Sequence, residues 1–131
     1  MPFNSRELAV KAAEAALKKK ALDVTILELS GLTVITDYFV ICSGESTTQV
    51  RAVAQFIEET FAQERLKPLG IEGAAHSHWI LLDYGDVIIH VFEKETRAYY
   101  NLEKLWMDAK TIEINEDKTD MAGKDKRTIY S

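Results

Sequence analysis

Two apolar runs separated by a short turn constrain the fold of this chain more than any other feature. The runs are residues 79–82 (WILL) and 87–92 (VIIHVF), and the turn between them is residues 83–86 (DYGD). Runs rich in β-branched and aromatic residues on either side of a Gly/Asp turn predict a β-hairpin. Apolar residues then recur at helical spacing, so we expect the hairpin to lead into a helix. The helical positions are Tyr99, Leu102, Leu105 and Trp106.

The same stretch divides into an expected core and an expected surface. The side chains predicted to lie in the core are Leu81, Ile89, Val91, Leu102, Leu105 and Trp106. Those predicted to lie on the surface are Asp83, Tyr84, Asp86, Glu93 and Tyr100. Trp79 fits either assignment, because a ring at the end of a strand is often half exposed.

The rest of the chain predicts an α/β domain. Helical patterns cover residues 5–20 and about 46–66, and strand-like runs cover residues 23–29, 38–42 and 69–72. Asn4 with Glu7, and Ser46 with Gln49, have the spacing of capping boxes at the two helix starts. This order predicts one mixed β-sheet of about five strands with helices packed against it. We expect residues 38–72 to form a right-handed parallel crossover.

A length of 131 residues suits a single compact domain, which we assign to residues 1–110. The chain turns polar after Lys110, so residues 111–131 are predicted to be an extended or disordered tail. Within this tail, residues 111–114 (TIEI) have a pattern suited to pairing at an edge of the sheet.

The charge balance points to a protein partner. The formal net charge is −5 and the pI is about 5.2, which disfavours a basic face for nucleic acid. An acidic patch that meets a basic protein fits this balance better. The N-terminal residues lack the pattern of a signal peptide, and no apolar segment approaches the roughly 20 residues that span a bilayer. We therefore expect a cytoplasmic protein that does not bind membranes.

The segment from Ser43 to Thr48 (SGESTT) invites comparison with a phosphate-binding turn. It joins a strand to a helix, and free amides at a helix start can bind anions. However, it lacks the glycine and lysine spacing of a P-loop, and Glu45 would repel phosphate. Capping by Ser46 and Gln49 explains the same residues without a ligand.

Histidines and the single cysteine give no convincing catalytic site. His76, His78 and His90 could offer imidazoles to a metal, but a metal site also needs convergent geometry. His90 lies in an apolar strand, where a histidine with satisfied hydrogen bonds in the core is the more common situation. Cys42 also lies in an apolar run, where burial raises the thiol pKa and makes the group inert. We predict no catalytic residue, no cofactor and no bound metal.

Binding is better supported than catalysis, because aromatic and acidic residues are concentrated in one stretch. The aromatics are Trp79, Tyr84, Tyr99, Tyr100 and Trp106, and the acids are Asp83, Asp86, Glu93, Glu95 and Glu103. Aromatic anchors surrounded by polar groups are typical of protein interfaces. Burial in the core is the competing explanation for both tryptophans, and we favour it for Trp106.

Four segments of the chain resemble the ribosomal silencing factor (RsfS, or Iojap) family. They are DYFVICSGES (37–46), IEG (71–73), WILLDYGDVIIHVF (79–92) and RAYYNLEKLW (97–106). The last two, in this order and spacing, are the more specific. The resemblance covers about residues 5–109 and leaves out the polar tail.

This resemblance implies a mixed α/β domain related to the nucleotidyltransferase fold but without a demonstrated transferase activity. It implies docking on the large ribosomal subunit, through the protein numbered fourteen in that subunit's series. A factor bound there would sterically block joining of the small subunit and so repress translation. The family also includes organelle relatives tied to assembly of the large subunit, and its members are often homodimers. Direct nucleic-acid binding is not implied.

The matching motifs supply a set of candidate partner-binding residues, in which acids would face basic side chains and aromatics would supply buried area. They are His78, Trp79, Asp83, Tyr84, Asp86, Glu93, Arg97 and Tyr100. One alternative is an assembly factor that uses the same surface. Another is a nucleotidyltransferase-like enzyme using Ser46 with Asp83 and Asp86, although the D-x-D or D-x-E pair such an enzyme needs is missing.

Overall fold

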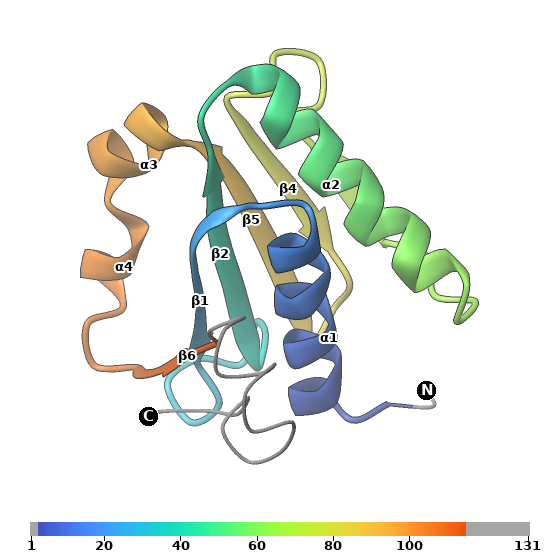
Figure 1. Ribbon diagram of the computed structural model, residues 1–131. Coiled ribbons are helices and arrows are strands. Elements are labelled where there is room, and N and C mark those ends of the chain that lie inside the picture. Colours follow the sequence, from blue (N-terminus) through green and yellow to red (C-terminus); the bar gives the residue numbers. More distant parts are fainter. Residues whose placement is uncertain (1–2, 115–131) are drawn as a thin grey trace.

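The structure is a computed structural model that describes residues 3–114 of the chain (Figure 1). It is a single α/β domain built on a mixed six-stranded sheet, one strand more than the sequence predicts. The elements are α1 (Ser5–Lys18), β1 (Leu22–Glu28), β2 (Tyr38–Gly44), α2 (Thr47–Ala62), β3 (Gly70–Glu72), β4 (Trp79–Asp83), β5 (Val87–Glu93), α3 (Lys94–Tyr100), α4 (Leu102–Leu105) and β6 (Lys110–Glu113).

The strands lie in the order β3-β4-β5-β2-β1-β6. The predicted hairpin is confirmed: β4 and β5 pair antiparallel, with Trp79 opposite Phe92 and Asp83 opposite Ile88. The central strands β2 and β5 pair in parallel, and the other neighbouring pairs are antiparallel. Because β4 and β5 separate β3 from β2, the predicted crossover reaches the far edge of the sheet.

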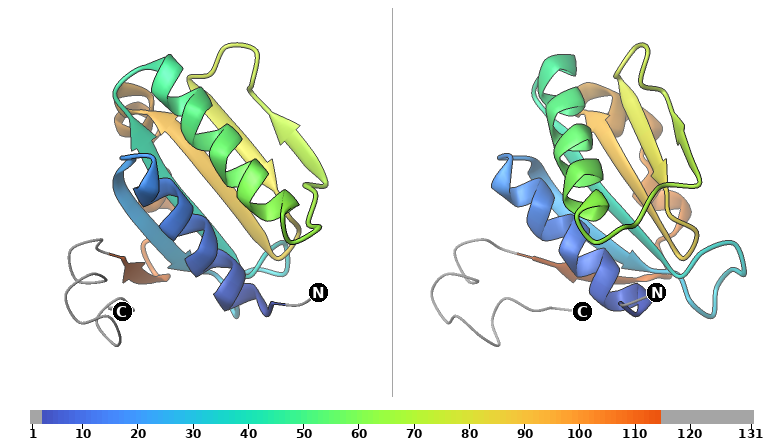
Figure 2. Two further views of the ribbon diagram at one scale, coloured as in Figure 1. Left: turned by 45° about the vertical axis from the view of Figure 1, so that its right-hand side comes forward. Right: turned by 90° about the vertical axis from the view of Figure 1, so that its right-hand side faces the viewer.

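Helices cover both faces of the sheet. Figure 2 shows α1 and α2 side by side over one face, with α3 and α4 on the opposite side. Alanines of α1 at positions 9, 12, 13 and 16 are fully buried, and these small side chains let the helix pack closely on the sheet. A smaller cluster on the opposite face joins Leu27, Leu29, Ile41 and Phe92, partly covered by Leu102 and Trp106.

The helix starts follow the predicted caps, with one shift. At α1 the capping box is present: the Asn4 side chain accepts from the Glu7 amide, and Glu7 accepts from the Asn4 amide. At α2, Ser46 accepts from the Gln49 amide, but Gln49 Oε1 accepts from the amide of Glu45 at 2.8 Å. The second half of this box therefore closes one residue earlier than predicted.

The predicted edge pairing of residues 111–114 is confirmed for most of the segment. Strand β6 pairs antiparallel with β1, with Ile112 opposite Ile26, and both side chains are buried. Ile114 is buried as well, so the domain continues a few residues beyond the predicted boundary at Lys110. The predicted extended or disordered state of residues 115–131 lies outside the described part of the chain.

The predicted helix after the hairpin is two short helices. Asn101 adopts a left-handed conformation (φ 48°, ψ 55°) between α3 and α4 and ends the regular hydrogen bonding. Asn tolerates this region better than most residues. None of the helices within residues 3–114 combines the length and hydropathy needed to cross a bilayer.

Candidate partner-binding site

Trp79 stands at the start of β4 and is half-buried among other aromatic rings. Its ring stacks on Phe92 of β5, with centroids 4.7 Å apart, and lies 5.1 Å from the ring of Tyr100 on α3. Tyr100 itself is 53% exposed. Both sequence assignments for Trp79 are therefore partly right, because the ring packs against Phe92 and Tyr100 and still remains partly exposed.

The indole of Trp79 is also held by a hydrogen bond. Its Nε1–H donates to Nδ1 of His90 at 3.1 Å. His90 is only 3% exposed, and burial lowers its pKa to about 4. Its Nε2 has no hydrogen-bond partner within residues 3–114, so this core histidine is only half satisfied.

The loop before β4 depends on a glycine. Gly73 has a φ of +85°, and a Cβ added there would overlap the carbonyl oxygen of Trp79. The loop is closed further on by Ser77, whose amide donates to Gly73 O and whose hydroxyl donates to Ala74 O. The Ser77 hydroxyl also accepts from Arg51 Nε on α2 at 3.1 Å. These contacts fix the chain as it enters Trp79.

A surface hollow of about 600 Å³ opens beside Trp79. It is lined by Gly73, His76, His78, Trp79, Glu93, Glu95, Thr96, Tyr99 and Tyr100. Within it, His78 Nδ1 lies 2.7 Å from Glu93 Oε1, so one of the two glutamates has an imidazole partner. The hollow combines exposed aromatic surface with an excess of carboxylate, which suits a basic, partly apolar ligand.

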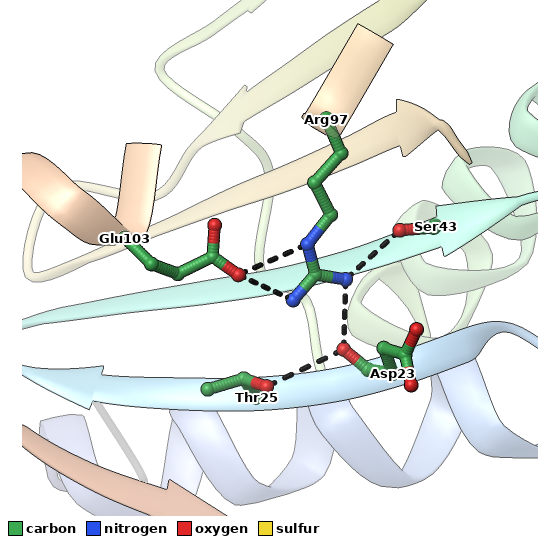
Figure 3. A network of polar contacts seen from close by, with 5 residues as sticks. All are labelled: Asp23, Thr25, Ser43, Arg97 and Glu103. Atoms are coloured by element: carbon green, nitrogen blue, oxygen red, sulfur yellow. Dashed lines mark hydrogen bonds and ion pairs between the residues drawn. The ribbon is translucent and has the colours of Figure 1, made fainter. Parts of the chain in front are cut away.

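Arg97, one of the predicted binding residues, points inward. Nε and Nη2 donate to Glu103 Oε2 on α4 at 3.0 and 2.6 Å. Nη1 donates to the carbonyl oxygen of Asp23 and to the hydroxyl of Ser43, both at 2.8 Å (Figure 3). The Arg97 side chain is 12% exposed. Arg97 therefore fastens α3 and α4 to the sheet.

The turn residues Asp83, Tyr84 and Asp86 lie away from the hollow. Asp83 is four residues along β4 from Trp79, roughly 13 Å at the rise of a strand. Asp83 Oδ1 accepts from the Gly85 amide at 2.8 Å, and Asp86 is exposed. The structure thus separates the predicted set into a group at the hollow (His78, Trp79, Glu93, Tyr100), a group at the turn, and the inward Arg97.

The predicted surface position of Tyr84 is wrong. Its side chain is 8% exposed and packs edge-on against Phe61 of α2, with centroids 4.7 Å apart. Burial, with a smaller contribution from Glu58, raises the pKa of Tyr84 to about 12. The predicted core position of Leu105 is also wrong, because α4 leaves it 75% exposed.

Five residues that line the hollow were not among the predicted binding residues (Gly73, His76, Glu95, Thr96 and Tyr99), and two of them, Glu95 and Tyr99, add a carboxylate and an aromatic ring. Tyr99 was assigned to the apolar positions of the predicted helix, but it is 81% exposed. The available signal was the clustering of aromatics and acids in this stretch, which included both residues.

The geometry argues against a nucleotidyltransferase site. Ser46 follows the C-terminal end of β2, whereas Asp86 O accepts from the Tyr38 amide at the N-terminal end of the same strand. The seven residues of β2 separate them by roughly 20 Å. Ser46 and the two aspartates therefore cannot act on one phosphate group.

Other catalytic candidates are not assembled either. The Glu45 and Gln49 amides at the start of α2 are occupied by side-chain oxygens. Burial raises the pKa of the fully buried Cys42 thiol to about 12, with Arg97 acting weakly in the opposite direction. Across residues 3–114, no three His, Cys, Asp or Glu side chains converge to hold a metal ion, so the three histidines do not form the site considered above.

Comparison with known proteins places the chain in a family. Residues 2–130 match the family model described as "Ribosomal silencing factor during starvation", a match that extends into the polar tail left out of the resemblance above. The ribosomal silencing factor RsfS of Halalkalibacterium halodurans is 42% identical over 112 residues, covering 86% of this chain and 96% of that protein.

A more distant relative and a solved structure are also similar to this chain. The mouse protein named "Mitochondrial assembly of ribosomal large subunit protein 1" is 33% identical over 92 residues, covering 68% of this chain and 40% of that protein. A crystal structure from Chromobacterium violaceum superposes with a TM-score of 0.77 at 32% identity, covering 79% of this chain and 87% of the other. The chain belongs to the RsfS family of ribosomal silencing factors.

Proposed function

We propose that this protein is a ribosomal silencing factor that docks on the large ribosomal subunit and acts by occupation. In this proposal it binds the protein numbered fourteen of that subunit, at the face where the small subunit joins, and blocks joining. The names of the bacterial relatives support a ribosomal role. The proposal includes a cytoplasmic location and no enzymatic step.

The observation that carries the proposal is the hollow beside Trp79. It offers a half-buried tryptophan, an exposed Tyr100 and the carboxylates of Glu93 and Glu95 in one place. Large rigid rings supply contact area, and carboxylates select basic surfaces. We infer that basic side chains of the ribosomal protein enter this hollow, with His78 and Glu93 at its rim.

The first test is sedimentation with purified subunits. The factor should travel with free large subunits and, at saturation, should abolish the light-scattering change that accompanies subunit joining. Equal distribution over both subunits, or joining undisturbed at saturation, would contradict the proposal.

Matched variants locate the site. Trp79→Ala and Tyr100→Ala should each weaken binding by about 30-fold, equivalent to roughly 2 kcal/mol. Tyr100 is 53% exposed, so its variant should change the melting temperature less than Trp79→Ala does and should report mainly binding. Glu95→Gln should weaken binding and its salt dependence, whereas Glu59→Gln, an exposed glutamate on α2, should leave both unchanged.

The second candidate function is assembly of the large subunit through the same surface. The printed name of the mouse relative favours it. Deletion of the gene should then cause precursor large subunits to accumulate, whereas a factor that acts only in silencing should leave mature subunits at normal levels. Homodimerisation is a separate proposal, which light scattering of the purified protein tests.

A further inference from the structure

Two contacts constrain the Trp79 side chain beside the hollow, and His90 provides the directional one. Stacking on Phe92 restrains the plane of the indole but is compatible with two orientations related by a half-turn of χ2, which place Nε1 on opposite edges. The hydrogen bond from Trp79 Nε1–H to His90 Nδ1, at 3.1 Å, selects one of the two.

His90 is itself immobile. It lies in the middle of β5, paired with Leu81 on β4 and Ile41 on β2, and is 3% exposed. The Phe39 ring packs against it at 4.5 Å in an edge arrangement. Because Nδ1 accepts a hydrogen bond from the indole N–H, the neutral imidazole carries its own proton on Nε2. The acceptor is therefore held in place by the centre of the sheet.

We propose that His90 is a positioning residue for partner recognition: it holds the Trp79 indole in the orientation in which the exposed part of the ring lines the hollow. This inference rests on the proposed docking function. It also specifies the contact, because the indole N–H is already donated inside the domain. The partner meets the exposed carbon atoms of the indole, so an aliphatic stem or a guanidinium group packed against the ring fits, and an acceptor that needs the indole N–H does not.

Two substitutions separate positioning from space filling. Asn places its amide oxygen close to where the Nδ1 of histidine lies, so His90→Asn keeps an acceptor and loses volume. His90→Phe keeps an aromatic ring and loses the acceptor. A positioning role ranks Asn above Phe in binding, whereas a purely packing role ranks Phe above Asn.

The direct readout is the indole N–H resonance of Trp79 in a ¹H–¹⁵N spectrum. The chain has two tryptophans, so the resonance missing in Trp79→Phe identifies it. In His90→Phe we expect this resonance to shift and its exchange with water to accelerate, and affinity for large subunits to fall about tenfold. In His90→Asn we expect exchange to stay slow and affinity to remain within about threefold, even where the melting temperature is lower.

The outcomes distinguish the two proposals. If the wild-type protein does not bind large subunits, or if Trp79→Ala binds them as tightly as the wild type does, the docking proposal fails at this site. The recognition role of His90 then fails with it. If Trp79 matters but its resonance and affinity are unchanged in His90→Phe, the positioning role alone is overturned. Loss of binding in His90→Asn with full binding in His90→Phe would assign His90 to packing and overturn it too.

Discussion

Arg97 and Glu103 clamp two short helices together, with Nη2 and Nε of the arginine 2.6 and 3.0 Å from one carboxylate oxygen. Neither α3 nor α4 contains a fully buried residue, although Leu102 of α4 is partly buried against the sheet. The same guanidinium reaches the sheet at Asp23 and Ser43. The position of α3, which carries Tyr99 and Tyr100, therefore depends on a polar contact.

Arg97→Ala should lower the free energy of unfolding by about 2 kcal/mol. The substitution removes the donors that Arg97 supplies to the Ser43 hydroxyl and the Glu103 carboxylate. Because Glu103 is partly exposed, the loss of stability is smaller than for a fully buried ion pair. Arg97→Lys should lower the free energy of unfolding less than Arg97→Ala does, because lysine keeps the positive charge, although it lacks the planar set of donors of arginine. Urea denaturation measures both. Lys104→Ala, at an exposed position of α4, is the control, and an equal loss there would refute the explanation.

Gly73→Ala should destabilise the protein by roughly 2–4 kcal/mol, because it combines a positive φ with overlap onto the Trp79 carbonyl. Two other glycines separate these causes. Gly31 has a φ of +88° in open space, so Gly31→Ala should lose only about 1 kcal/mol. Gly70 has neither a positive φ nor an atom close to an added Cβ, so Gly70→Ala should leave the stability almost unchanged. Thermal denaturation of the three variants should reproduce this order, and a neutral Gly73→Ala would contradict it.

The stability of the domain should fall in mild acid because of His90. Well above pH 6.5 the imidazole is neutral in both the folded and the unfolded chain. Between pH 6.5 and about 4 the unfolded chain binds a proton that the folded chain excludes, so the free energy of unfolding decreases as pH falls. The decrease due to this residue is about 3 kcal/mol over that interval. His90→Asn should show a flatter profile, and parallel profiles for the two proteins would show that His90 does not titrate in this way.

Nucleoside triphosphates with magnesium should give no heat of binding in calorimetry. Ser46 and the aspartates at the β4–β5 turn lie at opposite ends of β2, so no cradle for a triphosphate is assembled from them. A saturable signal that disappears in Ser46→Ala would overturn this conclusion.

Local patterns predicted most elements, because each depends on neighbouring residues. The capping box at Asn4 and the hairpin are examples. The strand pattern of residues 111–114 is local too, although its partner strand β1 is distant in sequence. The errors come from contacts distant in sequence. Tyr84 belongs to a turn, which favours exposure, but Phe61 on α2 covers it. The three-dimensional structure likewise divides the predicted binding residues between the hollow and the turn, which motif membership does not reveal.

A conformational choice at one residue explains the remaining error. Tyr99, Leu102, Leu105 and Trp106 have helical spacing, but the left-handed Asn101 rotates the second helix relative to the first. Leu105 then turns outward, while Leu102 and Trp106 still pack against the sheet. Spacing cannot reveal such a break, since it assumes an uninterrupted helix.

The hydrogen bond between Arg97 and Asp23 joins residues 74 positions apart in the chain. Closing a loop of this length costs more conformational entropy than closing the β4–β5 hairpin, so we expect this contact to form later in folding than the hairpin. The hairpin that carries Trp79 is local and can form early, but the wall of the hollow on α3 reaches its place only when β1, β2 and α4 are present together. Recognition competence is thereby tied to completion of folding, and a partly folded chain lacks the finished surface.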